Sequence, residues 1–159
     1  MMQRVLAFDV GERRIGVAVS DAMGWTAQGL TTYERAADDL AADVARLLAL
    51  AEPYRPVRLL FGLPRNMDGS FGPQAEGVRA FAAAVGARWD GEYDFFDERL
   101  TTVSAERVLL EADMSRRRRR QVVDKVAAVV ILQSWLDAQA AHAPETEGNA
   151  MSENQENNI

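Results

Sequence analysis

Three acidic residues lie in segments that are otherwise apolar. Asp9 follows the apolar run VLAF, Glu98 ends the segment YDFFDE, and Asp124 shares a helical stripe with the apolar residues at positions 127, 128, 131 and 132. A buried carboxylate must be paired, hydrogen-bonded or bound to a cation. If these three side chains converge, they form an all-oxygen cluster that suits Mg²⁺ or Mn²⁺. Two such ions can activate water and stabilise the leaving oxygen in phosphodiester hydrolysis.

Each of these acids also has a simpler interpretation. Asp9 stands beside a glycine turn, where an aspartate often accepts hydrogen bonds from turn amides. Glu98 could form an ion pair with Arg99 or with the arginine run at 116–120. Asp124, near a helix start, could complement the helix dipole. The occurrence of all three, on two strands and one helix, favours a functional site over three separate structural roles.

The composition leaves few other kinds of catalysis. The 159 residues contain no Cys and a single His, His142, which lies in a polar C-terminal stretch. A thiol nucleophile, a cysteine-ligated metal and a Ser–His–Asp triad are therefore not expected. No apolar run approaches the roughly 20 residues of a membrane helix, and the N-terminus does not resemble a signal peptide. We expect a cytoplasmic protein without a membrane partner.

Basic residues are clustered although the chain is acidic overall. The whole chain has a net charge of −6, and residues 1–137, which exclude the last four glutamates, have a net charge of −2. Arg13 and Arg14 follow the first predicted strand, and Arg65 lies in a glycine-rich loop that follows another strand and could meet a phosphate. A run of five arginines comes later: Arg116, Arg117, Arg118, Arg119 and Arg120. These clusters are either solvated surface or contacts to a nucleic-acid backbone.

The hydrophobic pattern predicts one α/β domain, residues 1–141, followed by a disordered acidic tail, residues 142–159. Apolar runs predict strands at 4–10, 15–20, 25–33, 57–61 and 93–98. The 3.6-residue period predicts helices at 36–51, 73–85, 102–112 and 121–141. The first two strands should pair as a hairpin, and the alternation that follows implies a mixed sheet covered by helices.

Four sequence blocks resemble one known family. They are DVG (9–11) with RIGVAVSD (14–21), GLP (62–64) with DGS (68–70), DERLTT (97–102), and VDKVAA (123–128) with ILQ (131–133). These blocks are similar to the YqgF (RuvX) family, bacterial Holliday junction resolvases that are also described as nucleases maturing the 5′ end of 16S ribosomal RNA precursors. The resemblance implies a ribonuclease H-like fold, with a five-stranded mixed sheet whose first three strands are antiparallel, flanked by helices.

The resemblance also implies the residues of a metal-dependent site. Asp9, Glu98 and Asp124 are the catalytic metal ligands it implies, with Asp9 bridging two Mg²⁺ or Mn²⁺ ions. Position 127, where related resolvases carry a further acid or histidine, is Ala127 here. Thr101 and Thr102 could position the scissile phosphate or cap the next helix. The arginines named above are the expected contacts to nucleic acid.

We therefore expect a metal-dependent endonuclease acting on branched DNA or on precursor ribosomal RNA. A junction resolvase cuts two strands symmetrically, which favours a homodimer, whereas an RNA processor can act as a monomer. Two alternatives remain open. One is a non-catalytic RNA- or ribosome-binding factor, and the other is a nucleotide-binding module, since the Asp9 hairpin also resembles the phosphate-binding hairpin of the sugar kinase/actin superfamily.

Overall fold

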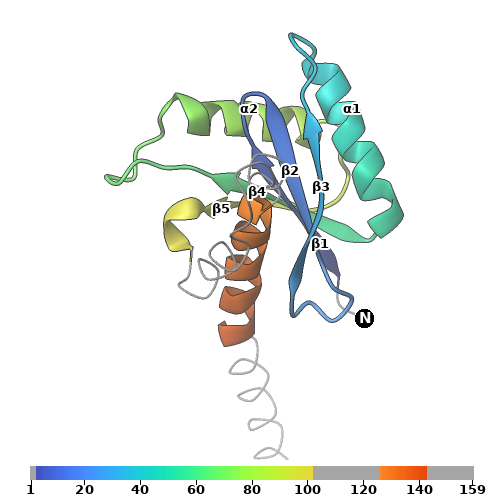
Figure 1. Cartoon of the computed structure of the whole chain (residues 1–159), viewed down its shortest axis with the longest axis vertical. Coiled ribbons are helices and arrows are strands. Elements are labelled where there is room, and N and C mark those ends of the chain that lie inside the picture. The colour runs from blue at the N-terminus through green and yellow to red at the C-terminus, as the bar shows by residue number, and fades with distance from the viewer. Residues whose placement is uncertain (1–2, 102–125, 143–159) are drawn as a thin grey trace, which may run out of the picture.

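The computed structural model describes residues 3–101 and 126–142. Five strands form one mixed sheet in the order β3-β2-β1-β4-β5 (Figure 1). They are β1 (Arg4–Val10), β2 (Arg14–Ser20), β3 (Ala27–Glu34), β4 (Val57–Leu63) and β5 (Tyr93–Asp97). The first three strands pair antiparallel, and β4 runs parallel to both β1 and β5. The predicted fold class and the predicted hairpin are confirmed.

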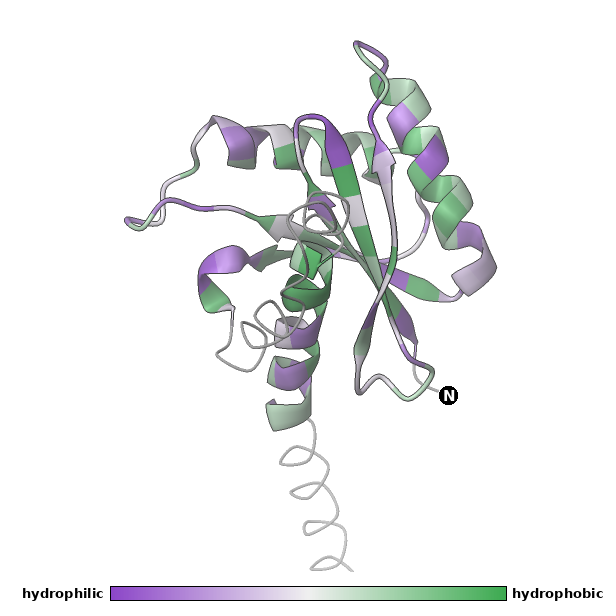
Figure 2. Ribbon diagram, viewed as in Figure 1, coloured by the Kyte–Doolittle hydropathy of each residue, from purple (hydrophilic) through white to green (hydrophobic). Residues whose placement is uncertain are grey.

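Helices cover both faces of this sheet. α1 (Leu40–Ala51) and α2 (Pro73–Gly86) pack on one face, and a C-terminal helix, residues 126–142, crosses the other (Figure 1). The hydrophobic part of that helix is the part that crosses the sheet (Figure 2). Because side chains alternate along a strand, Leu6 and Phe8 enter the α1/α2 core, whereas Val5 and Ala7 enter the core under the C-terminal helix. Asp9 continues the second series and therefore faces the C-terminal helix.

The first helix begins later than the sequence pattern predicts. α1 starts at Leu40 rather than at residue 36, because Asp38 has a positive φ of 56° and Asp39 caps the helix by accepting a hydrogen bond from the Ala42 amide at 3.0 Å. Leu40 is consequently 44% exposed instead of lying on the buried stripe. The third strand also starts late, at Ala27, because residues 21–26 form a turn that fixes Trp25 outside the sheet.

Several predictions fall on residues that the structure does not describe. They are the helix at 102–112, the start of the last helix and the acidic tail after residue 142. Within the described residues, none of the helices has the length and apolar character needed to span a bilayer.

Candidate active site

Asp9 lies near the carboxyl end of β1, between two glycines on the neighbouring strands. Gly16 of β2 is its direct partner across the antiparallel ladder. On the other side, the β1–β4 register ends at the Phe8–Phe61 pair, so Asp9 is level with Gly62 of β4. Cross-strand neighbours on one face normally fill the space beside a side chain. The two glycines place no side chain beside the Asp9 carboxylate, and at Gly62 the side chains of Ile131 and Glu98 come close instead.

The turn that follows Asp9 is held from the other side of the sheet by Arg35. Its Nη1 donates to the Gly11 carbonyl at 3.0 Å, and its Nε donates to Asp43 Oδ2 at 2.9 Å. Asp43 is only 3% exposed and also accepts a hydrogen bond from the Ala36 amide at 2.8 Å. An ion pair between a partly buried arginine and a buried carboxylate, with further hydrogen bonds to the backbone, fixes geometry. The end of β1 is thereby anchored to α1.

Glu98 begins a short 3-10 helix, η2 (Glu98–Leu100), directly after β5. Asp97 caps this helix by accepting a hydrogen bond from the Arg99 amide at 3.0 Å. The Asp97 carboxylate is also bound by the Arg99 guanidinium, with Nη2 at 2.7 Å, which lowers the pKa of Asp97. Glu98 was predicted to end the strand, and the cap at Asp97 is the reason why it starts a helical turn instead.

Asp9 and Glu98 are brought close enough for their charges to interact. Burial raises the pKa of Glu98 to about 7, and the neighbouring carboxylates of Asp9 and Asp97 add to the rise. Arg99, the ion-pair partner that the sequence offered for Glu98, binds Asp97 instead. Within residues 3–101 and 126–142, no ion pair is formed by the Glu98 carboxylate. The protein thus holds a half-buried acid against two other acids.

Gly62 lets the C-terminal helix approach this pair of acids. A Cβ atom at position 62 would lie 2.4 Å from Ile131 Cδ1 and 3.5 Å from Glu98 Cδ. Ile131 is 1% exposed and belongs to the core beneath the helix. The absence of a side chain at Gly62 therefore decides how closely the helix and Glu98 can pack. It also places the Ile131 stripe, to which Asp124 belongs by sequence spacing, beside Glu98.

Arg65 contacts other parts of the protein beside the carboxyl ends of β4 and β5. Its guanidinium donates to the Gly69 carbonyl and lies 3.5 Å from Asp97 Oδ2. It also stacks on the Phe71 ring, at 4.7 Å from the ring centroid. Arg65 therefore ties the loop between β4 and α2 to the end of β5.

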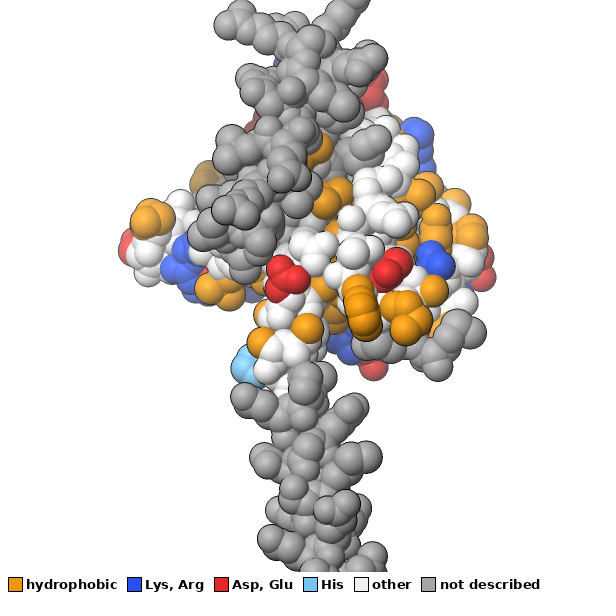
Figure 3. Space-filling view, turned by 60° about the horizontal axis from the view of Figure 1, so that its bottom comes forward, with side chains coloured by type: hydrophobic (Ala, Val, Ile, Leu, Met, Phe, Trp, Pro, Cys, Tyr) orange, Lys and Arg blue, Asp and Glu red, His pale blue; other side chains and the backbone are white. Residues whose placement is uncertain are grey.

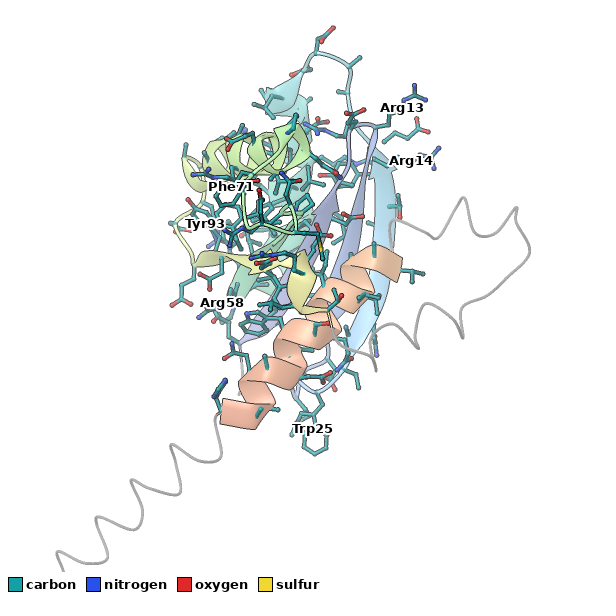
Figure 4. The ribbon with its side chains drawn as sticks, turned by 90° about the vertical axis from the view of Figure 1, so that its left-hand side faces the viewer. Arg13, Arg14, Trp25, Arg58, Phe71 and Tyr93 are labelled. Atoms are coloured by element: carbon teal, nitrogen blue, oxygen red, sulfur yellow. The ribbon has the colours of Figure 1, made fainter. Side chains whose placement is uncertain are left out.

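The remaining predicted residues divide into those described and those not. Arg13 and Arg14 are exposed at the turn after β1 (Figure 4), where they border an open pocket of about 960 Å³. Thr101 donates its backbone N–H to the Glu98 carbonyl at 3.4 Å. The structure does not describe Asp124, Thr102 or the five arginines at 116–120.

The donors at Asp9 and Glu98 fit a hard divalent cation. Both are carboxylates, and each repels the other unless a positive charge or a proton lies between them. Among residues 3–101 and 126–142, no group of three His, Cys, Asp or Glu side chains is arranged to hold a metal. The third acid that the sequence predicts, Asp124, lies outside these ranges.

Two contributors to this site were absent from the sequence prediction. Asp97 caps η2 and raises the pKa of its neighbour Glu98. Gly62 provides the space for Ile131. The sequence prediction ended this strand at residue 61 and placed Gly62 in the following loop, whereas β4 continues to Leu63. A glycine inside a buried strand signals close approach, so the misplaced strand end hid the signal.

This sheet order, with helices on both faces, is that of the ribonuclease H-like fold. The structure is similar to RuvC from T. thermophilus in complex with a Holliday junction, with a TM-score of 0.60 at 12% identity, covering 89% of this chain and 98% of that chain. It is also similar to the fowlpox virus resolvase in complex with junction DNA, with a TM-score of 0.52 at 9% identity, covering 85% and 97%. At these identities the likeness concerns the fold.

The chain belongs to the RuvX family, described as Holliday junction resolvases, whose model matches residues 3–138. Among its relatives, a protein of Moorella thermoacetica named as a candidate pre-16S rRNA nuclease is 61% identical over 84% of this chain and 94% of its own length. A protein of Heliobacterium modesticaldum with the same name is 49% identical over 94% of this chain and 99% of its own. The predicted family is therefore confirmed, and it is a family of nucleases.

Proposed function

We propose that this chain is a metal-dependent endonuclease that hydrolyses phosphodiester bonds in structured RNA, with the 16S ribosomal RNA precursor as its substrate. The observation that carries the proposal is the pairing of Asp9 with Glu98, a half-buried acid whose pKa is raised to about 7 by burial and by neighbouring carboxylates. Such a perturbed pair is typical of functional sites. The names of relatives at 49–61% identity favour the RNA substrate.

Asp9, Glu98 and Asp124 would hold the cation. When bound, Mg²⁺ or Mn²⁺ supplies Lewis-acid activation for phosphodiester hydrolysis. The fit rests on carboxylate oxygens alone, on the glycines that flank Asp9 and let Glu98 lie close to it, and on the charge repulsion that a cation would relieve. Whether one or two ions are held depends on Asp124.

The other side chains around the acids orient the substrate and the ligands. Arg13 and Arg14 stand exposed just past Asp9 and are suited to bind phosphates flanking the cleaved bond. Arg99 and Arg65 hold Asp97, and through the Asp97 cap they fix the position of Glu98. Arg65 accordingly acts as a positioning residue, in addition to the phosphate contact that the sequence suggested.

A cleavage assay tests this proposal. We expect the full chain to shorten a precursor 16S RNA fragment in Mn²⁺ or Mg²⁺ and to be inactive in EDTA. Glu98→Gln should lower cleavage by at least about 10²-fold. The matched control is Glu92→Gln, the same chemical change at an exposed acid just before β5, and it should retain cleavage. If Asp9→Asn and Asp124→Asn leave the cellular function of the chain intact while lowering its stability, the acids serve structure and the chain is a non-catalytic RNA- or ribosome-binding factor.

A four-way DNA junction is the second candidate substrate, because the family model is described as a Holliday junction resolvase. The same assay separates the two. Paired symmetric nicks in the junction without any RNA cleavage would assign the resolvase activity, and would also predict a homodimer.

A further inference from the structure

A second pocket lies at the end of the sheet opposite Asp9. Its volume is about 510 Å³, within the range of pockets that hold small ligands or side chains. It lies between the turn at residues 21–26 and the C-terminal helix, and its walls include Val5, Met23, Trp25, Arg58 and Trp135. Since Val5 is near the start of β1 and Asp9 near its end, the pocket is separate from the acidic site, as the distance between Arg14 and Trp25 in Figure 4 shows.

The turn that carries Trp25 is rigidly held. Asp21 Oδ1 accepts hydrogen bonds from the amides of Trp25 at 2.7 Å and Thr26 at 3.3 Å, and these bonds lower the pKa of Asp21. Gln133 of the C-terminal helix donates to the Trp25 carbonyl at 3.1 Å and accepts from the Ala27 amide at 3.0 Å. Only backbone groups of Trp25 take part. The indole ring is left free to contact a partner without any loss to the fold.

Large apolar side chains are exposed around this pocket. Trp25 is 72% exposed and Met23 is 62% exposed. Figure 3 shows hydrophobic side chains gathered beside the C-terminal helix at this end, next to acidic ones. Preorganised aromatic residues next to an apolar pocket are the usual centre of a protein–protein contact.

The described lining of the pocket contains no acid, but four acids lie beside its lining residues. Of the described residues that line it, Arg58 is the one cation, and it is bound to both Glu92 and Asp94. These two acids are 62% and 50% exposed and can accept further donors. Asp21 lies behind Trp25, and Asp137 accepts a hydrogen bond from Gln133 at 3.0 Å. Among the described residues, these four acids outnumber the one arginine, so this surface disfavours the binding of phosphates.

We propose that this pocket binds a cationic peptide segment of a partner protein, with a large apolar side chain in the pocket and Lys or Arg side chains against Glu92, Asp94 and the face of Trp25. An exposed indole ring attracts cations through its π face, and carboxylates at the rim give charge complementarity. The binding site is independent of the nuclease site and leaves the acidic end accessible.

The test is a titration of the full chain with a short peptide that alternates lysine and leucine, followed by intrinsic tryptophan fluorescence. We expect binding that weakens with salt. Trp25→Ala should weaken it about tenfold, as expected for a central aromatic contact, and Glu92→Lys should weaken it severalfold. Met67→Ala is the matched control, because Met67 is 94% exposed in the loop between β4 and α2. RNA cleavage should be unchanged in Trp25→Ala.

Any of the following results would overturn the proposal. One is equal binding of a glutamate–leucine peptide, and another is unchanged lysine–leucine binding by Trp25→Ala. A third is competition by single-stranded RNA, which would make the pocket a nucleic-acid site. The fourth is loss of self-association in Trp25→Ala, detected by sedimentation, which would assign the pocket to a second copy of the chain. A protein ending at His142 should bind the peptide as the full chain does, and much tighter binding would show that the tail occupies the pocket.

Discussion

Two groups of acids lie on the same side of the sheet, at opposite ends of β5, and they are treated differently. Glu92 and Asp94, at the start of the strand, are largely exposed and both bind Arg58. Glu98, just past its end, is half-buried beside Asp9 and Asp97, and the pKa of Glu98 is raised to about 7. At the start of β5, Arg58 partly neutralises the two acids. At its end, the carboxylates of Asp9, Asp97 and Glu98 lie close together.

The difference shows how environment assigns roles to chemically similar side chains. An exposed acid paired with an arginine contributes little to the free energy of unfolding, because water screens both charges. A half-buried acid that faces other acids destabilises the fold when it is ionised, and a divalent cation relieves this destabilisation. This unfavourable interaction between carboxylates lies at the carboxyl ends of β1 and β5, where ligands of open α/β sheets commonly bind.

The largest effect is expected from Asp9→Asn, which removes one of the two facing charges. Cleavage should fall by about 10³-fold, the upper range for loss of one electrostatic contributor in an active site. The pKa of Glu98 should move down from about 7 toward its usual value, because the repulsion from Asp9 is gone. Carboxyl NMR titration in EDTA measures this shift. An unchanged Glu98 pKa would mean that the two acids do not interact.

A smaller effect is expected from Gly62→Ala. The new Cβ would meet Ile131 Cδ1 at 2.4 Å and crowd Glu98, so we expect a loss of about 1–3 kcal/mol of stability. Cleavage should fall with it. The matched control is Gly77→Ala in α2, where a Cβ meets nothing within 4 Å, and it should stabilise the protein by about 0.5–1 kcal/mol.

Ile131→Val in the Gly62→Ala background sharpens this prediction. Removing the Ile131 Cδ1 methyl makes room for the new Cβ, so stability and cleavage should both recover in part. Chemical denaturation and the cleavage assay check this. If the second substitution brings no recovery, Gly62 acts through something other than the approach of the C-terminal helix.

Stability without metal should fall as the pH rises through the titration of Glu98. The folded state keeps a proton on Glu98 up to about pH 7, whereas the unfolded chain releases it near 4.5. Between these values the folded state binds more protons, so rising pH favours unfolding, and the loss is complete above pH 7. Thermal melts in EDTA at pH 5 and pH 8 should therefore differ by a few degrees. Mg²⁺ should reverse the loss at pH 8.

Glu98→Gln should remove this part of the pH dependence and raise the melting temperature at pH 8 in EDTA. A variant that melts with the same pH profile as the unmodified chain would contradict the burial of Glu98. Glu92→Gln is again the control, since that acid is exposed and bound to Arg58.

Much of this fold follows from sequence periodicity, whereas the site follows only in part. The apolar run at β1 and the alternation in β2 predict the hairpin because burial requires those patterns. The late start of α1 depends on a positive φ at Asp38, a local conformation that hydrophobic spacing does not encode. The pairing of Asp9 with Glu98 was predicted from burial and from the family. The role of Asp97 depends on the direction in which the chain turns at η2, and only the three-dimensional structure shows that turn.

The smallest effect is expected from Arg58→Leu, which makes the two ends of β5 more alike. Glu92 and Asp94 lose their shared guanidinium and the Arg58–Trp135 contact is lost, but both acids are well exposed and become hydrated. We expect a loss of about 1 kcal/mol or less that shrinks at high salt, with cleavage unchanged. Chemical denaturation at two salt concentrations measures this. A loss above about 3 kcal/mol would mean that this ion pair behaves as a buried one. The difference in solvent exposure would then not explain why Glu92 and Asp94 bind an arginine whereas Asp9 and Glu98 are proposed to bind a metal ion.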